Sequence, residues 1–370
     1  MKFLFYFLNE NSWRDAPLSY TSLISRCGFS GTETALLEMA KHLVDKGHSV
    51  QIYGDPNTYT DHNIQYIAEH DLDKVDTDVD WYSPLFFLSY NAHMQLLHRL
   101  NPARTKVFLW FHCFIEDRYI IDLKNRFRVY GQYVCRYVAD AYSHIVDKTN
   151  SWVVYNGVNT IFTTEQIPST KQGNWIFHAT YERGGNVARQ IFSKVNALTP
   201  DVAKTLNMLS YYTPDVHRNI SSSNIINHGS KTKLEVRDLL LQSDYFVYPL
   251  VLDDGRVHHD TFGSVMLEAL ACGVIVIVWD VACVSTVYGD HVVKIPVPDH
   301  VKHYYNPHAR FASCHWMLSD EAQQMFIDKI NELEADQAKK EQIRAKGVEW
   351  ARAITWDVLA ADMETQLLAH

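Results

Sequence analysis

The stretch "DTFGSVMLEALACG" over residues 260–273, with "VIVIVW" directly after it over 274–279, decides the fold. The first part predicts a helix that is apolar all round, as buried helices are, and Gly273 suits its C-terminal end. The second part is a continuous apolar run, typical of a strand that is covered on both faces. Helix, glycine and buried strand in this order indicate a parallel α/β sheet.

Glu268 is the carboxylate inside this apolar helix. An ionised carboxylate away from water is costly unless it is paired or accepts hydrogen bonds. Two interpretations stay open: Glu268 binds the hydroxyls of a ligand, such as a ribose diol, or it pairs with a buried arginine or a backbone amide. The start of the helix favours a nucleotide, because Phe262, Gly263 and Ser264 lie where backbone N–H groups and the helix dipole suit a phosphate.

Outward from this stretch, two sets of alternating strands and helices follow one another along the 370 residues. The first set begins with a strand, a helix and a strand, at 2–8, 31–47 and 48–54, and this order indicates a Rossmann-like domain. A stretch poor in periodic apolar residues, 156–173, reads as a linker, and a second Rossmann-like set begins at 174. The remaining predicted strands are 106–111, 142–146, 151–155, 174–180, 205–212, 223–229 and 244–250; the predicted helices are 186–197, 232–242 and most of 320–370.

Composition limits the classes of function. The formal net charge of -9 gives no electrostatic footprint for nucleic acid or an anionic membrane, so small or neutral partners are expected. Six scattered cysteines without C-x-x-C spacing predict neither a zinc site nor a disulfide framework, which fits a reducing compartment. No segment is long and apolar enough to predict a membrane span, and the acidic run 71–80 is predicted to be a solvated loop.

The pattern Asp260-x-Phe262-Gly263-x4-Glu268-Ala269-Leu270-Ala271-Cys272-Gly273 resembles the E-x7-E signature of glycosyltransferase family 4, which is of the glycosyl transferases group 1 type. Most of the chain takes part in the resemblance, since "GFSGTETALLEMAKHLVDKGHSV" resembles the family's first loop and helix and "VVYNGVN" its hinge. The resemblance implies the α/β GT-B fold, with two Rossmann-like domains facing a central cleft and a C-terminal helix that crosses back to the N-terminal domain.

The resemblance also implies roles for single residues on the donor side. Glu268 would bind the ribose of a nucleotide, and Asp260, where the family usually has Glu, would lie at the transferred sugar. Arg183 would lie against the diphosphate, and His178 falls near the family's other basic residue. The full donor-binding set that this implies comprises Glu268, Phe262, Gly263, Ser264, Gly31, Thr32 and His178, and the catalytic set comprises Asp260, Arg183 and His112.

Three of these residues belong to the N-terminal half. Gly31 and Thr32 would lie near the donor diphosphate and the acceptor, with Ser30 in place of the family's first glycine. His112, at the end of the predicted strand 106–111, would touch the donor sugar. Glu33 has an alternative, structural interpretation, because Ser30-x-x-Glu33 is also a helix capping box. Arg256, His258 and His259 are either sugar contacts or residues of a solvated loop.

The function implied is a retaining glycosyltransferase, which moves a sugar from a nucleoside diphosphate sugar to a glycan or related acceptor. The alternatives are a nucleotide-sugar epimerase or hydrolase and a non-catalytic nucleotide-sugar-binding module. An NAD oxidoreductase is the weakest rival, because "CGFSG" lacks the full G-x-G-x-x-G. We expect no metal and no cofactor, no nucleic acid and a cytoplasmic location, and peripheral contact with a membrane is left open. The predicted domains are 1–165 on the acceptor side, 166–345 on the donor side and a helix at 346–370 packing back.

Overall fold

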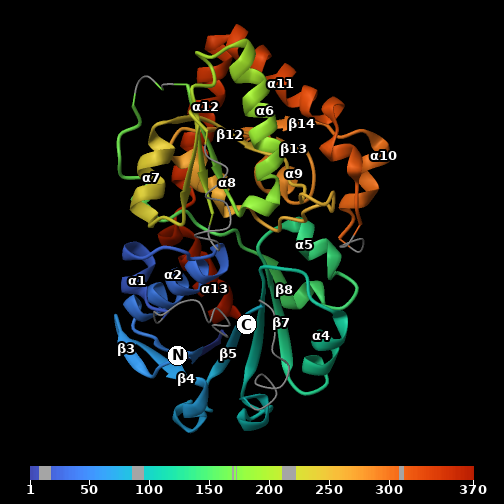
Figure 1. The fold of residues 1–370 in the computed structure, drawn as a ribbon. Helices are drawn as coiled ribbons and strands as arrows, with labels where there is room; N and C mark the ends of the chain where they lie inside the picture. The colour runs from blue at the N-terminus through green and yellow to red at the C-terminus, as the bar shows by residue number, and fades with distance from the viewer. Residues whose placement is uncertain (8–17, 86–95, 169–170, 172, 211–221, 308–311) are drawn as a thin grey trace. The chain divides into compact units, whose positions relative to one another are not determined.

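The computed structural model describes residues 1–7, 18–85, 96–168, 171, 173–210, 222–307 and 312–370. They form two compact units (Figure 1). Unit 1 comprises Met1–Ile24, Ser30–Gly157 and Trp356–His370, and unit 2 comprises Ser25–Phe29 and Val158–Thr355. Within unit 2, Val158 donates its backbone N–H to the carbonyl of Ile354 at 2.9 Å. The segments that begin and end the main part of unit 2 therefore run side by side.

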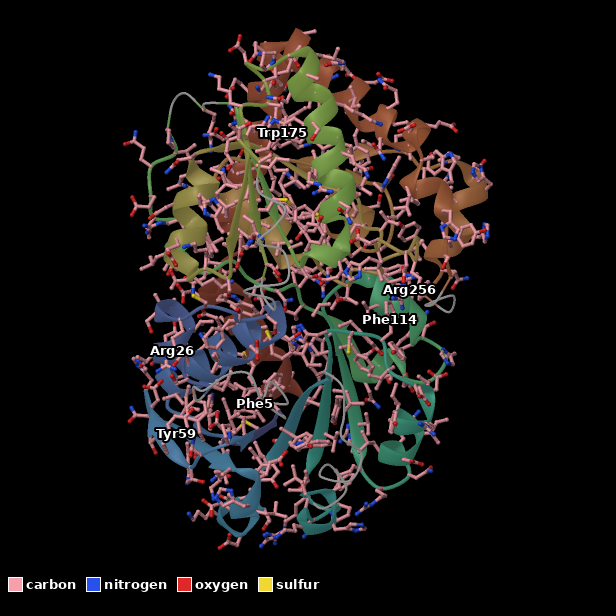
Figure 2. The ribbon with its side chains drawn as sticks, in the orientation of Figure 1. Phe5, Arg26, Tyr59, Phe114, Trp175 and Arg256 are labelled. Carbon is pink, nitrogen blue, oxygen red and sulfur yellow. The ribbon has the colours of Figure 1, made fainter. Side chains whose placement is uncertain are left out.

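Unit 1 is built on a sheet whose order, among the described residues, is β3-β4-β2-β1-β5-β6-β7-β8. All of its neighbouring strands pair in parallel except β3 and β4. The central strands are apolar, and Phe5 of β1, labelled in Figure 2, is fully buried. The strands are β1 Lys2–Tyr6, β2 Ser49–Asp55, β3 Tyr59–Asp61, β4 Ile64–Ala68, β5 Asp80–Leu85, β6 Lys106–Phe111, β7 Arg128–Tyr133 and β8 Ser151–Val153.

The α-helices in or next to this unit, over the described residues, are α1 Tyr20–Ser25, α2 Gly31–Asp45, α4 Asp117–Lys124, α5 Arg136–Ala141 and α13 Trp356–Ala369. The last of them, α13, packs against α2 in the same unit (Figure 1). Glu364 of α13 bonds to both His42 and His48, at 3.3 and 2.8 Å. The segment Trp356–His370 is thus an integral part of unit 1.

Unit 2 contains a wholly parallel sheet in the order β11-β10-β9-β12-β13-β14 among its described residues. Trp175 of β9, labelled in Figure 2, is buried in its core together with Trp279 of β13. Its strands are β9 Asn174–His178, β10 Thr205–Leu209, β11 Ile225–Gly229, β12 Ser243–Tyr248, β13 Ile275–Trp279 and β14 Val293–Ile295. Its helices are α6 Gly185–Leu198, α7 Lys233–Leu241, α8 Ser264–Ala271, α9 Val284–Val287, α10 Asp299–Lys302, α11 Asp320–Ala335 and α12 Gln337–Ala353.

The helices of unit 2 cover both faces of its sheet. From β9 the chain moves outward through α6 to β10, and from β12 it moves the opposite way through α8 to β13. Because parallel crossovers are right-handed, opposite directions place α6 and α8 on opposite faces. The helix α11 packs against α6, and α12 packs against α8. The apolar helix predicted at 260–273 is therefore enclosed between the sheet and a second helix.

The structure corrects two local predictions. Residues 142–146 are turns and not a strand, because Tyr142 follows α5 and its hydroxyl bonds to the backbone N–H and carbonyl of Ile115, at 2.5 and 2.9 Å. The acidic run 71–80 is not only a loop, since it contributes to a 3₁₀ helix, Glu69–Lys74, and begins β5 at Asp80.

Candidate functional site

The predicted donor-side residues gather at one edge of the unit 2 sheet. The chain runs from β9 to β10 and β11 on one side, and then returns to β12 on the other side of β9. The carboxyl ends of β9 and β12 thus form the topological switch point, where open α/β sheets bind their ligands. His178 ends β9 and Tyr248 ends β12.

Glu268 of α8 lies in a buried three-residue ion cluster. Its Oε2 atom accepts a hydrogen bond from Nε2 of His178 at 2.7 Å, and its Oε1 atom contacts Nζ of Lys233. The side chains of Glu268, His178 and Lys233 are only 7%, 1% and 9% exposed. In this structure the partners of Glu268 are therefore a lysine and a histidine, and not the arginine or backbone amide that the sequence suggested.

The charge of Glu268 is stable in this environment. Burial alone would raise the pKa of its carboxyl, but the charge of Lys233 and the hydrogen bond from His178 outweigh it and lower the pKa to about 2. An ionised carboxylate only accepts hydrogen bonds, so Nε2 of His178 must carry a hydrogen. Glu268 thus stays ionised at neutral pH at the switch point, with Lys233 as its counter-ion.

Asp260 stands at the entry to α8 and is almost fully buried. Its carboxylate accepts hydrogen bonds from the Tyr248 hydroxyl at 3.1 Å and from the Phe262 backbone N–H at 3.2 Å. A bond from the N–H two residues on is an Asx-turn, which the short side chain of Asp can close. This accounts locally for Asp260 where the family has Glu, and it means that the Phe262 amide is engaged within the chain.

Gly263 directly precedes α8 at this site. It is the N-cap in the left-handed region, with φ of 77°, and no side chain caps the helix there. A Cβ atom at this position would overlap the Met266 side chain and lie 3.4 Å from Oδ2 of Asp260. Phe262 points into the core, whereas Ser264 is half-buried at the first turn. Glycine therefore lets the chain turn sharply beside the Asp260 carboxylate.

Arg183 belongs to the same end of the sheet, on the 3₁₀ turn Tyr181–Arg183 after β9. Its side chain interacts with the Tyr248 hydroxyl, whose pKa burial and the Asp260 charge hold well above the usual value. Burial and the Arg183 charge lower the pKa of His258 well below its usual value. Arg183, Tyr248, Asp260 and His258 thus form a second cluster with a cation near the sheet edge.

A strained residue supports this second cluster. Leu250, two residues after β12, has φ of 52°, which is unfavourable for a side chain other than glycine. Its carbonyl accepts the His258 backbone N–H at 3.0 Å and the Tyr305 hydroxyl at 2.8 Å. Nε2 of His258 is buried and has no hydrogen-bond partner among the described residues.

The predicted residues of unit 1 lie at the carboxyl edge of their own sheet. Gly31 and Thr32 begin α2, where Ser30 and Glu33 form the capping box in both directions, with N-to-O distances of 2.7 and 3.3 Å. The structural interpretation of Glu33 is therefore confirmed. His112 directly follows β6, and burial lowers its pKa to about 3, so the ring is neutral at neutral pH.

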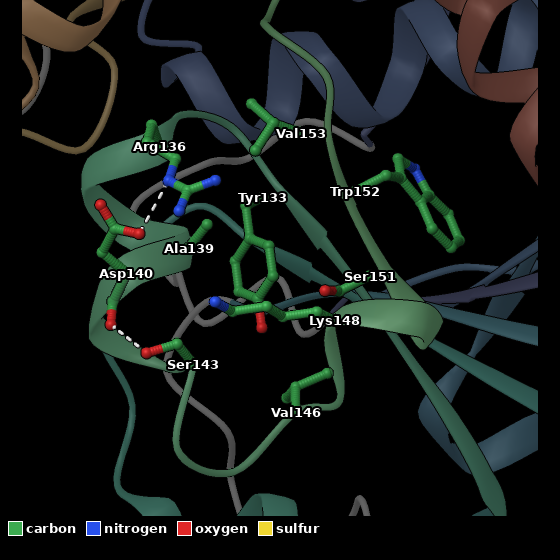
Figure 3. Close-up of a pocket in the computed structure, with 10 residues that line it drawn as sticks. All are labelled: Tyr133, Arg136, Ala139, Asp140, Ser143, Val146, Lys148, Ser151, Trp152 and Val153. Atoms are coloured by element: carbon green, nitrogen blue, oxygen red, sulfur yellow. Dashed lines mark hydrogen bonds and ion pairs between the residues drawn. The ribbon is translucent and has the colours of Figure 1, made fainter.

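A separate hollow of about 200 Å³ lies in unit 1 between α5 and β8 (Figure 3). Its polar lining includes Tyr133, Arg136 and Lys148, and Arg136 is paired with Asp140 at 2.7 Å. None of the predicted site residues lines it, so it does not belong to the clusters described above.

No group of His, Cys, Asp and Glu side chains in the described part of the chain could hold a metal ion. Among the same residues, no helix has the length and apolar character that a bilayer crossing requires.

Lys233 and Tyr248 are the site residues that sequence reasoning missed. Tyr248 sits in an apolar strand, where nothing sets it apart from other core aromatics. Lys233 did carry a signal, because it is the first residue of α7, directly after the N-cap Thr232 and within the Thr232–Glu235 capping box. The helix dipole disfavours a cation at that position, so a lysine there calls for a carboxylate partner.

Comparison with known proteins agrees with this architecture. The family model described as "Glycosyl transferases group 1" matches residues 220–350, which include α7, α8 and the Glu268 carboxylate. No curated protein matches the chain.

Solved glycosyltransferase-type structures share the fold over nearly their whole length. Sucrose-phosphate synthase from Thermosynechococcus elongatus is 13% identical, with a TM-score of 0.68, covering 100% of this chain and 99% of that one. Anabaena HepE in complex with UDP-glucose is 14% identical, with a TM-score of 0.67 and full coverage of both chains. WaaG, a glycosyltransferase involved in lipopolysaccharide biosynthesis, is 11% identical, with a TM-score of 0.63 and 98% coverage of both. The chain therefore has the α/β fold of the GT-B glycosyltransferases, and its residues 220–350 match the glycosyl transferases group 1 model.

Proposed function

We propose that the protein is a retaining glycosyltransferase, which moves a sugar from a nucleoside diphosphate sugar to a hydroxyl of a glycan or related acceptor. The observation that carries this proposal is the buried, ionised Glu268 at the switch point of unit 2, inside the matched domain. A ribose diol offers such a carboxylate two hydrogen-bond donors, and the phosphates that follow the ribose would reach toward the N-terminus of α8.

The main barrier to sugar transfer is charge, which develops on the leaving diphosphate and on the oxocarbenium-like sugar. Under this proposal the α8 N-terminus and Arg183 stabilise the diphosphate, and Asp260 stabilises the sugar. Asp260 is held for that role by Tyr248, whose hydroxyl keeps its proton. The acceptor attacks from the face that the diphosphate leaves, and the leaving phosphate takes the acceptor proton. The roles predicted for Gly31, Thr32 and His112 stay predictions.

The proposal includes transfer without a divalent metal, because Arg183 and the helix N-terminus supply positive charge at the diphosphate. Activity should then persist at full rate in excess EDTA, whereas a metal-requiring transferase would stop and recover with Mg²⁺ or Mn²⁺. The scattered cysteines fit a reducing compartment, so the proposal places the protein in the cytoplasm.

Two other functions are compatible with the same fold. A nucleotide-sugar epimerase or hydrolase would convert or cleave the donor without an acceptor, and a non-catalytic module would bind it unchanged. The three are separated by incubating the protein with UDP-, GDP-, dTDP- and ADP-sugars, with and without acceptor glycans, and following nucleotide release and anomeric configuration by NMR. UDP-glucose is the first donor to try, because HepE was solved in complex with it.

A new linkage with the donor's anomeric configuration, absent in Glu268→Ala and reduced in Asp260→Ala, would support the proposal. An inverted product would exclude the retaining mechanism. Donor conversion that no acceptor changes would favour the epimerase or hydrolase, and saturable binding without turnover would favour the binding module. Lys339→Met is a suitable control, since its ammonium makes an exposed ion pair with Glu332 on the helices α11 and α12.

A further inference from the structure

We propose that Lys233 is an exchangeable counter-ion: it holds Glu268 while the nucleotide site is empty, and it moves to the donor's diphosphate when the ribose takes the carboxylate. This inference rests on the proposed function. It adds a diphosphate-binding residue that neither the signature nor the loop after β9 contains.

The first step is that both oxygens of the Glu268 carboxylate have a partner and are enclosed from solvent in this structure. Lys233 covers Oε1 and His178 covers Oε2, and all three side chains are more than nine-tenths buried. Because these two side chains cover the carboxylate, a ribose diol reaches it only when one of them moves aside.

Lys233 is the partner that can leave. His178 is anchored at the end of β9, which pairs with a strand on each side, and its short side chain has few alternative positions. Lys233 instead reaches the carboxylate from α7 through a flexible four-carbon stem. Its ammonium lies 5.7 Å from the centre of the Phe162 ring, so the stem has an apolar wall along which it can move.

The diphosphate lies within reach of the displaced ammonium. Ser264, at the start of α8, precedes Glu268 by four residues, which is about 6 Å along a helix axis. The ribose on Glu268 is covalently joined to the phosphates at the helix start. The Lys233 ammonium therefore leaves the Glu268 carboxylate and pairs with the diphosphate. Without that exchange, Lys233 would remain buried and unpaired at the first position of α7, where the helix dipole also disfavours it.

The second cluster explains why a further cation is needed. Each phosphate of the donor brings a negative charge, and Arg183 is the cation that the structure gives to that cluster. At position 178, where the family has a basic residue, this chain has a histidine that is engaged with Glu268. Lys233 would supply the second positive charge at the diphosphate from a different element.

The test compares the binding of a nucleoside with that of its diphosphate by isothermal titration calorimetry, for the four bases of the donor panel. The variant is Lys233→Met, which keeps the stem and removes the charge. Lys231→Met is the matched control. Lys231 lies two residues before Lys233, and it makes an exposed ion pair with Glu235 at 3.0 Å. We expect Lys233→Met to bind the nucleoside at least as tightly as the wild type and the diphosphate about tenfold more weakly.

Equal weakening of nucleoside and diphosphate would overturn the inference, since Lys233 would then only position Glu268. Unchanged binding of both would overturn it as well. Lys233→Gln, which can still donate a hydrogen bond to Glu268, repeats the comparison if the methionine variant melts well below the control. A wild-type protein that binds none of the four diphosphates would overturn the proposed function itself, whereas normal wild-type binding with an unchanged ratio in the variants overturns the role of Lys233 alone.

Discussion

The ionisation of Glu268 makes the free energy of unfolding of unit 2 depend on pH. Its carboxyl has a pKa of about 2 in the folded protein, below the ordinary value of 4.5. A depressed pKa contributes stability that is fully present above the ordinary value and is lost as the pH falls toward the folded value. We expect the Glu268 contribution, about 3 kcal/mol at neutral pH, to disappear between about pH 4.5 and pH 2. Urea unfolding at a series of pH values, for wild type and Glu268→Gln, measures this difference.

Glu332 provides the control, because its pKa is also lowered to about 2, through hydrogen bonds from Lys329 and Lys339. This cluster is on the surface, so salt screens it, whereas the Glu268 cluster is buried. In 1 M NaCl the pH dependence attributable to Glu332 should vanish and that of Glu268 should persist. If Glu268→Gln and wild type lost stability in parallel below pH 4.5, the buried charge assigned to Glu268 would be wrong.

At the scale of single residues, the sequence predicted that Glu268 is buried and requires partners, but it did not identify those partners. An apolar helix around Glu268 implied a buried carboxylate that required partners. The partners come from residues 90 and 35 positions away, on β9 and α7. Such pairs depend on how the elements pack, which no local pattern encodes. The Ser30–Glu33 capping box was predictable for the opposite reason, since both partners lie within one helical turn.

The start of α8 is the element whose backbone positions the second cluster. Gly263→Ala should destabilise unit 2 by about 2–3 kcal/mol, because alanine is unfavourable in the left-handed region and its methyl group would displace the Met266 side chain. It should also weaken nucleotide binding, since the helix start beside Asp260 would shift. Denaturant unfolding and calorimetric binding of the nucleoside diphosphate measure the two effects.

Gly289→Ala is the control for backbone strain alone, because Gly289 also has a positive φ, 50°, and a Cβ there would meet nothing within 4 Å. We expect it to cost about 1 kcal/mol and to leave nucleotide binding unchanged. Equal losses of stability in the two variants would mean that the contacts around Gly263 add nothing to the strain.

At the scale of elements, long apolar or amphipathic segments were predictable and short ones were not. The strands at 106–111 and 244–250 and the helix at 31–47 appear close to their predicted ranges. Two strands that were not predicted are β14 and β7. The edge strand β14 has only three residues, and β7 contains the polar residues Arg128 and Gln132. Residues 142–146 have the composition of a strand, yet side-chain bonds from Tyr142 to Ile115 hold them in turns.

At the scale of the whole molecule, the order of elements was sufficient to predict two Rossmann-like parts. Alternation of strands and helices implies parallel sheets, and a fresh start after a linker implies a second core. The sequence could not give the strand order that creates the switch point between β9 and β12, since that order depends on the direction of each crossover. The predicted linker 156–173 also contains local structure, namely the 3₁₀ helix Thr160–Phe162 and a β-bridge between Val158 and Thr355.

Two separate cores have a consequence for ligand binding. Glu268, Lys233, His178 and Arg183 all belong to unit 2, so a nucleoside diphosphate held by them stabilises this unit directly. At a ligand concentration of 100 times Kd, linkage predicts about 2.7 kcal/mol of stabilisation, and global opening of unit 2 should slow about 100-fold in hydrogen exchange. Mass spectrometry of peptides from β12, α7 and α8 measures this slowing, and peptides from β1 and β2 report unit 1 in the same sample. Glu268→Ala at the same ligand concentration should show exchange at the ligand-free rate. Equal protection of β1, β2 and β12 by the nucleoside diphosphate would contradict the assignment of its binding site to unit 2, because a site confined to one core stabilises that core first.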